Sequence, residues 1–322
     1  MSGYTLYGGE LSLFTRKLEA ALIFYGADYK FEPKQAHNAA EIESRSGTHQ
    51  VPVLRTPENW MIGDTTPIMT LLDGRFPSRA MFPSGAMGAV VHILEEFLDE
   101  WVARVMVHYR WHYPESAAFA ANKIALGDAE RAASIAAWGP RACRATGTAS
   151  EMQQSAAEDE YQRLLAAAES QLQQSSFLLG DRPTAVDCIF LGGLRAHTNM
   201  DPDPKKVVAN YPTVVAWAEQ RADLWQGDGE LLAPPGTEFA RHVASEMVTT
   251  YAPFVLANQA ALSAGAKAFK ADIYGEEVSY LTRPYPEQSR QMISQRLANL
   301  AASERAQVDQ WLKDYGLKAV FD

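Results

Sequence analysis

Apolar positions in the first 75 residues follow two periods, one typical of short strands and one typical of amphipathic helices. A Gly-Gly turn after the first apolar run leads into a helical stripe that ends at Gly26. A second helical stripe begins at Asp64, and the polar stretch 35–48 predicts a loop with room for a short helix. The predicted strands are residues 4–7, 29–31, 51–54 and 60–62. This order predicts a small α/β domain.

The pattern becomes wholly helical after residues 73–88, a stretch rich in Pro, Gly and Ser that is typical of a linker. Apolar doublets recur every four residues from Ile93 to Met106 and predict one long helix with a wide buried face. Alanine-rich helical segments continue to about Ala222. No strand pattern occurs in this part of the chain, so it predicts an all-α domain.

A Pro-Pro-Gly break within 231–236 separates the helical domain from a long tail. The tail begins as a helix, alternates around Gly275 as a β-hairpin does, and closes with two amphipathic helices. The predicted organisation is residues 1–75 for the α/β domain, 76–88 for a linker, 89–235 for the helical domain and 236–322 for a C-terminal extension.

Composition excludes several classes of protein. The 322 residues are 47% hydrophobic and 21% charged, with a net charge of −10, which disfavours nucleic-acid and anionic-membrane partners because both select for basic patches. No apolar run approaches the roughly 18 residues of a membrane-spanning helix, and no signal peptide is visible. Cys143 and Cys188 have neither metal-site nor disulfide-framework spacing, so we expect a reducing, cytoplasmic setting.

Two short motifs in the α/β domain have both a structural and a chemical interpretation. In the segment LYGGELSLFTRK, Ser12 stands where a helix begins and is a favoured N-cap. The same position suits an anion such as a thiolate, because a helix N-terminus carries partial positive charge and unpaired N–H groups. Asp64 and Thr65 likewise cap the next helix in one interpretation and hold an amino-acid head group in the other.

A third motif, Val51-Pro52, interrupts an apolar run with a proline. With these motifs in this order, the sequence resembles the glutathione transferase superfamily over about residues 4–225. The segments that carry the resemblance are Leu6–Lys17, Val51-Pro52, Asp64-Thr65, Leu178–Asp187 and Tyr211–Trp217. The resemblance implies a thioredoxin-like N-terminal domain followed by an all-α domain, with the C-terminal extension as an unusual addition.

The resemblance implies roles for seven residues of the first domain. Ser12 matches the hydroxyl that activates the glutathione thiol in serine-type members, and Tyr7 is the runner-up because tyrosine-type members place their hydroxyl there. Both cysteines lie in the helical half, which argues against a thiol–disulfide reductase. The residues implied to bind glutathione are Gln50, Val51, Pro52, Asp64 and Thr65.

We expect the second-substrate pocket between the loop after the first strand and the far end of the long helix. Its predicted residues are Glu10, Leu11, Tyr109, Trp111 and Tyr113, although so dense an aromatic group has core packing as an equal alternative. His108 and His112 share a helical face but lack a third ligand, so we expect no metal. We interpret one acidic cluster as a solvated face or a dimer edge; it consists of Glu95, Glu96, Asp99 and Glu100.

Taken together, the sequence predicts an enzyme, a glutathione transferase that uses glutathione as co-substrate and transfers it to a small, apolar or aromatic electrophile. The alternatives are a non-catalytic module that binds a ligand or a protein, and a specialised glutathione-dependent lyase, dehalogenase or isomerase. The resemblance also implies a homodimer. The extension of almost ninety residues departs from the family and has no role that the sequence decides.

Overall fold

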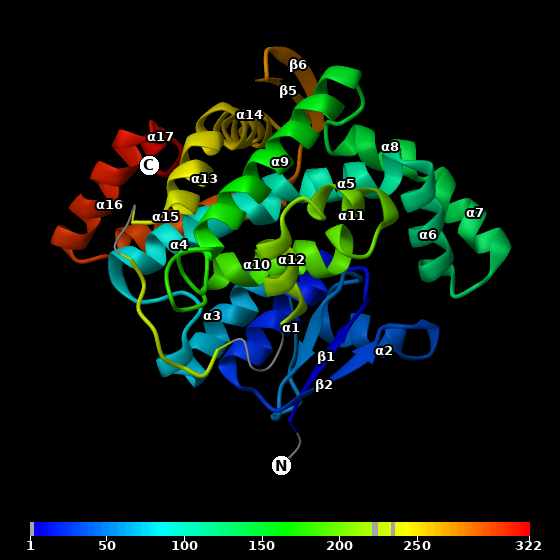
Figure 1. Cartoon of the computed structure of the whole chain (residues 1–322), viewed down its shortest axis with the longest axis horizontal. Coiled ribbons are helices and arrows are strands. Elements are labelled where there is room, and N and C mark those ends of the chain that lie inside the picture. Colours follow the sequence, from blue (N-terminus) through cyan, green and yellow to red (C-terminus); the bar gives the residue numbers. More distant parts are fainter. Residues whose placement is uncertain (1–2, 221–224, 233–235) are drawn as a thin grey trace.

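The computed structural model describes residues 3–220, 225–232 and 236–322. An α/β domain, a helical domain and a C-terminal extension follow one another along the chain, which confirms the predicted fold class (Figure 1). In Figure 1 the α/β domain lies at the bottom in blue, and the extension, from yellow to red, covers the top and left of the helical domain. Ala222 and the prolines of the predicted break, Pro234 and Pro235, lie outside the described residues.

The N-terminal sheet has the strand order β2-β1-β3-β4. Its strands are β1 Tyr4–Gly8, β2 Tyr29–Pro33, β3 Val53–Arg55 and β4 Met61–Gly63. β1 runs parallel to β2 and antiparallel to β3, and β3 pairs with β4 in the antiparallel sense. The third strand begins one residue after Pro52, since proline has no N–H to donate to a strand ladder.

Helices α1 Leu13–Tyr25, α2 Ala36–Ser46 and α3 Thr65–Arg75 complete the α/β domain. The stretch that predicted mainly a loop contains the 11-residue helix α2. A reciprocal capping pair of Gln35 and Asn38 starts it, and Gly47, with φ of 72°, ends it. Ile42 is its one buried residue, so its apolar face is too narrow to produce a visible stripe.

The long helix predicted after the linker is a continuous helical run with a π-helical turn inside it. The run consists of α4 Gly85–Glu96, the π-turn Phe97–Val102 and α5 Ala103–His112. The wider turn changes the phase of the helix and rotates the residues that follow it relative to those before it. The remaining helical elements of this domain are α6 Pro114–Ala125, α7 Ala129–Ala137, α8 Gly139–Ala145, α9 Glu151–Leu172, α10 Ala185–Gly193, the π-turn Leu194–Thr198, α11 Pro202–Val208 and α12 Pro212–Glu219.

Helix α10 joins the two domains by packing on α1. At Gly192 an added Cβ would lie 2.7 Å from the Leu13 carbonyl oxygen, so only glycine permits this approach. A capping box of Thr184 and Asp187, within the segment Leu178–Asp187 that carries the resemblance, starts α10. The start of α1 is thereby fixed against the helical domain.

The extension consists of α13 Glu238–Thr249, α14 Tyr251–Ser263, β5 Ala268–Ile273, β6 Glu276–Leu281, α15 Pro284–Ala298, α16 Ala302–Asp314 and α17 Lys318–Phe321. The predicted hairpin is confirmed, and its turn residues Tyr274 and Gly275 both have positive φ, of 55° and 79°.

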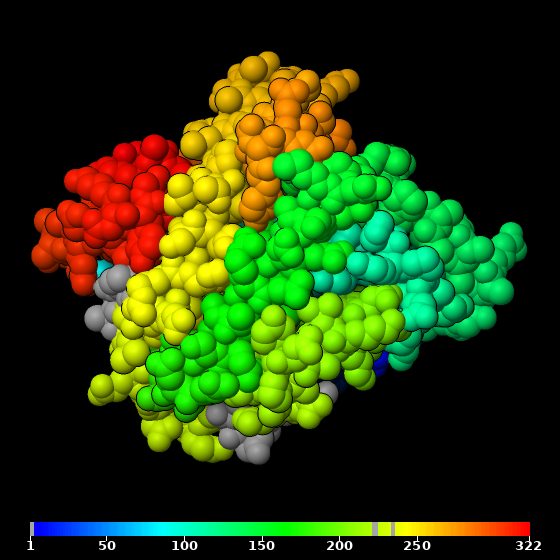
Figure 2. Space-filling model, turned by 45° about the horizontal axis from the view of Figure 1, so that its top comes forward, coloured from blue at the N-terminus to red at the C-terminus, as the bar shows by residue number. Residues whose placement is uncertain are grey.

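The extension packs along the helical domain and shares its hydrophobic core. Figure 2 shows it in yellow, orange and red beside the green surface of α9. The Tyr251 hydroxyl donates a hydrogen bond to buried Glu96 at 3.3 Å, and Arg296 donates to the Gly88 carbonyl at 3.2 Å. None of the helices in the described part of the chain is long and apolar enough to cross a membrane.

Candidate functional site

A cavity of about 680 Å³ lies where the α/β domain, the π-turn with α5, and the extension meet. The α/β domain lines it with the loop before β3 and the start of α3. Asp99 to Val107 contribute a second wall, and the extension adds residues from α14, from β6 and from the segment 283–285. Ala145 and Thr146, at the end of α8, also line it, so segments from all three parts of the chain form one binding space.

All five residues predicted to bind glutathione line this cavity: Gln50, Val51, Pro52, Asp64 and Thr65. The peptide bond between Val51 and Pro52 is cis. The main-chain N–H and C=O of Val51 have no hydrogen-bond partner among the described residues. An extended peptide can pair with a main chain in this state, as an added strand does at a sheet edge.

Asp64 holds an unusual conformation at the start of α3. Its φ is 71°, in the left-handed region that non-glycine residues rarely adopt, and its side chain does not cap the helix. Burial raises the pKa of the Asp64 carboxyl, and a hydrogen bond with Tyr285 of the extension and the charge of Lys17 oppose that rise. Asp64 thus lines the cavity, with Tyr285 of the extension beside its carboxyl.

Lys17 of α1 lies behind Asp64 and is fully buried. Its Nζ forms ion pairs with Asp99 at 2.6 Å and with Glu95, and donates to the Thr66 hydroxyl at 3.4 Å. Although burial opposes it, the negative charge of these two carboxylates raises the pKa of Lys17. This network connects the first helix to the π-turn.

The interpretation of the acidic cluster as a solvated face is wrong. Glu95 and Glu96 are buried, and Asp99 and Glu100 line the cavity. Glu95 and Glu96 end α4 on its buried side, and the π-turn that follows carries Asp99 and Glu100 to the cavity, a change of phase that the sequence pattern does not show. Lys17 could have predicted the burial of these carboxylates, because a cation on the buried side of α1 requires a buried anionic partner.

Ser12 is the N-cap of α1, and its Oγ accepts a hydrogen bond from the Thr15 N–H at 3.2 Å. A hydroxyl that accepts one hydrogen bond keeps its own proton to donate. Of the described residues that line the cavity, the one from α1 is Phe14, two residues after Ser12. Ser12 is half-buried at this edge of the cavity and does not line it.

Tyr7, the runner-up, is buried in a small cluster with Ile42 and Val53. Side chains alternate along a strand, and that of Tyr7 points to the face of the sheet that carries Ile42 of α2. Tyr7 is not among the described residues that line the cavity.

The residues predicted to form the second-substrate pocket lie elsewhere. Arg110 occupies the space between the first loop and the end of α5, where its guanidinium donates to the Leu11 carbonyl at 2.7 Å and pairs with buried Asp201 at 2.8 Å. Glu10 is exposed. A pocket cannot form where this buried ion pair fills the gap.

The aromatic residues at the end of α5 serve packing, the alternative that the sequence left open. Tyr109 stacks on Tyr113 with ring centroids 5.8 Å apart, and Trp111 meets Trp138 edge-on at 6.1 Å. The aromatic residues that do line the cavity are Phe14, Trp101, Phe254, Tyr280 and Tyr285.

The histidine pair of α5 is stacked, with the rings of His108 and His112 4.9 Å apart. His108 Nε2 lies 2.7 Å from Glu158 Oε1, which also accepts from the Tyr113 hydroxyl at 2.7 Å. Across the residues that the structure describes, no group of three or more His, Cys, Asp or Glu side chains is placed to hold a metal ion.

Two family models match the chain. The model of the glutathione S-transferase N-terminal domain matches residues 6–80, and the model of the glutathione S-transferase C-terminal domain matches residues 123–222. Together they cover more than half of the sequence. The chain belongs to the glutathione S-transferase superfamily.

Several solved structures of this superfamily are similar in fold to this chain. A glutathione S-transferase from Rhodospirillum rubrum F11 is 17% identical over 74% of this chain and 99% of its own, with a TM-score of 0.48. A GST-like protein from Pseudomonas syringae is 20% identical over 68% and 66%, with a TM-score of 0.47. A glutathione transferase homologue from Sulfitobacter with bound glutathione is 13% identical over 68% and 92%, with a TM-score of 0.41. No curated protein matches the sequence.

Much of the cavity wall lies outside the two transferase domain matches. Residues 99–107 fall between the two matched ranges, and residues 254–285 fall after both. The cavity residues around Val51 and Asp64 lie within the N-terminal domain match. Ala145 and Thr146 also lie within a matched range, whereas the cavity residues of 99–107 and of the extension do not.

Proposed function

We propose that this member of the superfamily binds glutathione in the cavity and catalyses its addition to, or substitution on, a small electrophile. The observation that carries the proposal is the convergence of Gln50, Val51 and Pro52 with Asp64 and Thr65 in one cavity. Val51 offers main-chain groups to the cysteinyl part of the tripeptide, and Asp64 and Thr65 offer a carboxylate and a hydroxyl to its γ-glutamyl end.

The chemical requirement is a glutathione thiolate, because a free thiol is only a few per cent ionised near pH 7. Ser12 and the N-terminus of α1 are the groups that we propose stabilise the anion. Each unit of pKa depression needs about 1.4 kcal/mol, which one hydroxyl hydrogen bond and a helix N-terminus can supply. The thiol proton passes to solvent as the thiolate forms, and the sulfur then forms a bond to the electrophilic carbon. In substitution the bond to the leaving group breaks and that group departs with the bonding electron pair. In addition the π bond of the electrophile opens, and the atom that receives its electron pair takes a proton from solvent.

The electrophile occupies the part of the cavity that Trp101, Val107 and Phe254 line, where an apolar or aromatic body fits. Because the extension contributes much of this wall, we propose a narrower range of substrates than an open cleft accepts. A homodimer in the cytoplasm remains our prediction from family membership, and light scattering of the purified protein tests the oligomeric state.

Calorimetric titration with glutathione tests the proposal. Thr65→Val removes a hydroxyl of the cavity with little change of shape, and we expect it to weaken glutathione binding about tenfold or more. The control is Thr70→Val in the same helix, because Thr70 is exposed and its hydroxyl donates to the Thr66 carbonyl. Absence of any heat with glutathione would contradict the proposal. Binding without turnover of any electrophile would favour the non-catalytic module.

A further inference from the structure

Arg104, near the start of α5, lines the cavity with a guanidinium that is only partly paired. Its side chain is 3% exposed, and its Nη2 donates to Glu160 Oε2 at 2.7 Å. Its Nε and Nη1 have no hydrogen-bond partner in the described part of the chain. Unsatisfied donors of a buried charged group are costly, so they point to a ligand that would accept from them.

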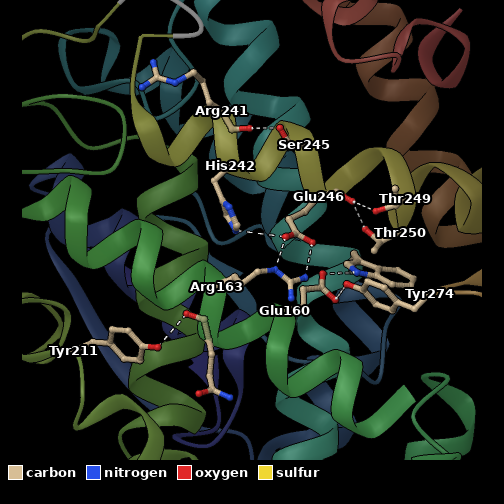
Figure 3. Close-up of polar contacts among 12 residues, drawn as sticks. Glu160, Arg163, Tyr211, Arg241, His242, Ser245, Glu246, Thr249, Thr250 and Tyr274 are labelled. Carbon is tan, nitrogen blue, oxygen red and sulfur yellow. Dashed lines mark hydrogen bonds and ion pairs between the residues drawn. The ribbon is translucent and has the colours of Figure 1, made fainter. Parts of the chain in front are cut away.

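Glu160 of α9 neutralises Arg104 from behind the cavity wall. Figure 3 shows Glu160 beside Tyr274, whose hydroxyl donates to Oε2 at 2.9 Å. The Trp101 indole N–H donates to the other carboxylate oxygen at 2.7 Å. Glu160 is therefore held on the far side of Arg104 and is not among the described residues that line the cavity.

Two of the three carboxylates that line the cavity, Asp99 and Glu100, have cationic partners of their own, and the third, Asp64, lies beside Tyr285. Asp99 pairs with Lys17 at 2.6 Å, and Glu100 pairs with Arg283 at 3.3 Å. The free N–H groups of Arg104 are thus not committed to either of these carboxylates. An anionic group on a ligand is the partner that they lack.

Tyr280 of β6 adds a second unpaired donor to the same cavity. It is 4% exposed, and its hydroxyl has no hydrogen-bond partner among the residues described. Burial raises the pKa of Tyr280 to about 12, so the hydroxyl keeps its proton at neutral pH.

Aromatic rings surround these donors. The Tyr280 ring meets Phe254 edge-on at 5.0 Å, Phe254 lies 5.6 Å from the Trp101 ring, and the Arg104 guanidinium lies over Trp101 at 4.2 Å. The site therefore combines an apolar wall with two kinds of hydrogen-bond donor.

We propose that the second substrate carries a carboxylate beside an aromatic or apolar body, and that Arg104 and Tyr280 bind this carboxylate. A planar guanidinium matches the geometry of a carboxylate with two parallel N–H donors. The inference rests on the proposed function, because it concerns the electrophile that glutathione attacks.

Two glutathione conjugates test the inference without requiring turnover. One carries a nitrobenzoate ring on sulfur, and the other carries a dinitrobenzene ring in which a nitro group replaces the carboxylate. We expect the wild type to bind the carboxylated conjugate about tenfold more tightly in calorimetric titrations, as one charge-assisted hydrogen bond provides. Tyr280→Phe should reduce this preference severalfold without changing the affinity for the conjugate with the uncharged dinitrobenzene ring.

The double variant R104M/E160Q removes both buried charges together and should abolish the preference. Tyr274→Phe is the matched control and should keep the preference, because the Tyr274 hydroxyl donates to Glu160 and Tyr274 is not among the described residues that line the cavity.

Equal affinity of the wild type for both conjugates would overturn the inference. An equal loss of affinity for both conjugates in Tyr280→Phe would also overturn it. If glutathione binds and the preference is missing, only this inference fails. If neither conjugate nor glutathione binds, the proposed function fails with it.

Discussion

Arg283 of the extension donates a hydrogen bond to Glu100 of the π-turn, with Nη2 and Oε2 3.3 Å apart. The two residues are separated by 183 positions in the sequence and both line the cavity. This pair connects the part of the chain that lies beyond the two transferase domain matches to the wall that faces Asp64. The extension is therefore part of the site, and the charge state of Glu100 affects how firmly it is held.

The first prediction concerns the pH dependence of stability. Burial raises the pKa of Glu100 to about 7, and Arg283 opposes the shift. Between about pH 4.5 and 7 the folded protein keeps a proton that the unfolded chain has lost, so Glu100 lowers stability as the pH rises through this range. Relative to Glu100→Gln, the wild type should lose roughly 3 kcal/mol of unfolding free energy from pH 4.5 to 8.

Urea denaturation of both proteins at several pH values measures this difference. Glu277→Gln, at an exposed position of the hairpin, is the control and should show the pH profile of the wild type. A constant difference between the wild type and Glu100→Gln at all pH values would contradict burial of this carboxyl.

A second prediction follows from the contact between Tyr285 and Asp64. The two side chains share a hydrogen bond, and burial together with Asp64 raises the pKa of Tyr285. The amino group of glutathione has to replace this hydrogen bond to reach Asp64, so Tyr285→Phe should increase glutathione affinity by about threefold to tenfold. Calorimetry measures the effect, with Tyr315→Phe of the same extension as control. Weaker binding by Tyr285→Phe would show that the hydroxyl contacts glutathione instead of competing with it.

A third prediction separates the two roles of Ser12. Ser12→Ala removes the hydrogen bond to the Thr15 N–H and should cost about 1 kcal/mol of stability. It should also raise the thiol pKa of bound glutathione by about one unit, because the anion loses a donor. Titration of the thiolate absorbance measures the pKa.

The control for Ser12 is Ser150→Ala. Ser150 caps α9 with the same 3.2 Å contact to the Gln153 N–H and is not among the described residues that line the cavity, and its hydroxyl also donates to Glu276 at 2.6 Å. We therefore expect a loss of stability at least as large as that of Ser12→Ala, and no change of the thiol pKa. If Ser12→Ala and the wild type titrate identically, Ser12 is a cap only, and Tyr7→Phe becomes the next variant to measure.

The fourth prediction concerns the capping box of α10. Buried Asp187 accepts hydrogen bonds from the Leu178 N–H at 2.9 Å and from the Thr184 N–H at 2.8 Å. Asp187→Ala leaves these buried donors unsatisfied and should cost about 3 kcal/mol or more in denaturant unfolding. Asp128→Ala removes an exposed cap at α7 and should cost only about 1 kcal/mol. Equal losses for the two variants would refute the structural role of Asp187.

Local signals in the sequence were sufficient for most of the fold. The glycine turn before Ser12, the Val51-Pro52 pair and the Thr184–Asp187 box each depend on neighbours within a few residues. Backbone sterics and capping act over that distance, so these motifs predict strand ends and helix starts. Helix α2 was not predicted as a full helix, because Ile42 is its one buried residue and its sequence therefore shows no apolar stripe.

What the sequence by itself determined is therefore the order of the elements, the two-domain class and five residues that line one cavity. Tertiary structure alone decided which carboxylates of the acidic cluster became buried, that Arg110 fills the space where the second pocket was expected, and that Arg104 and Tyr280 line the cavity instead. The physical reason is that burial depends on what packs against a residue. For Arg104 and Glu100 those partners come from α9 and from the extension, more than fifty positions away.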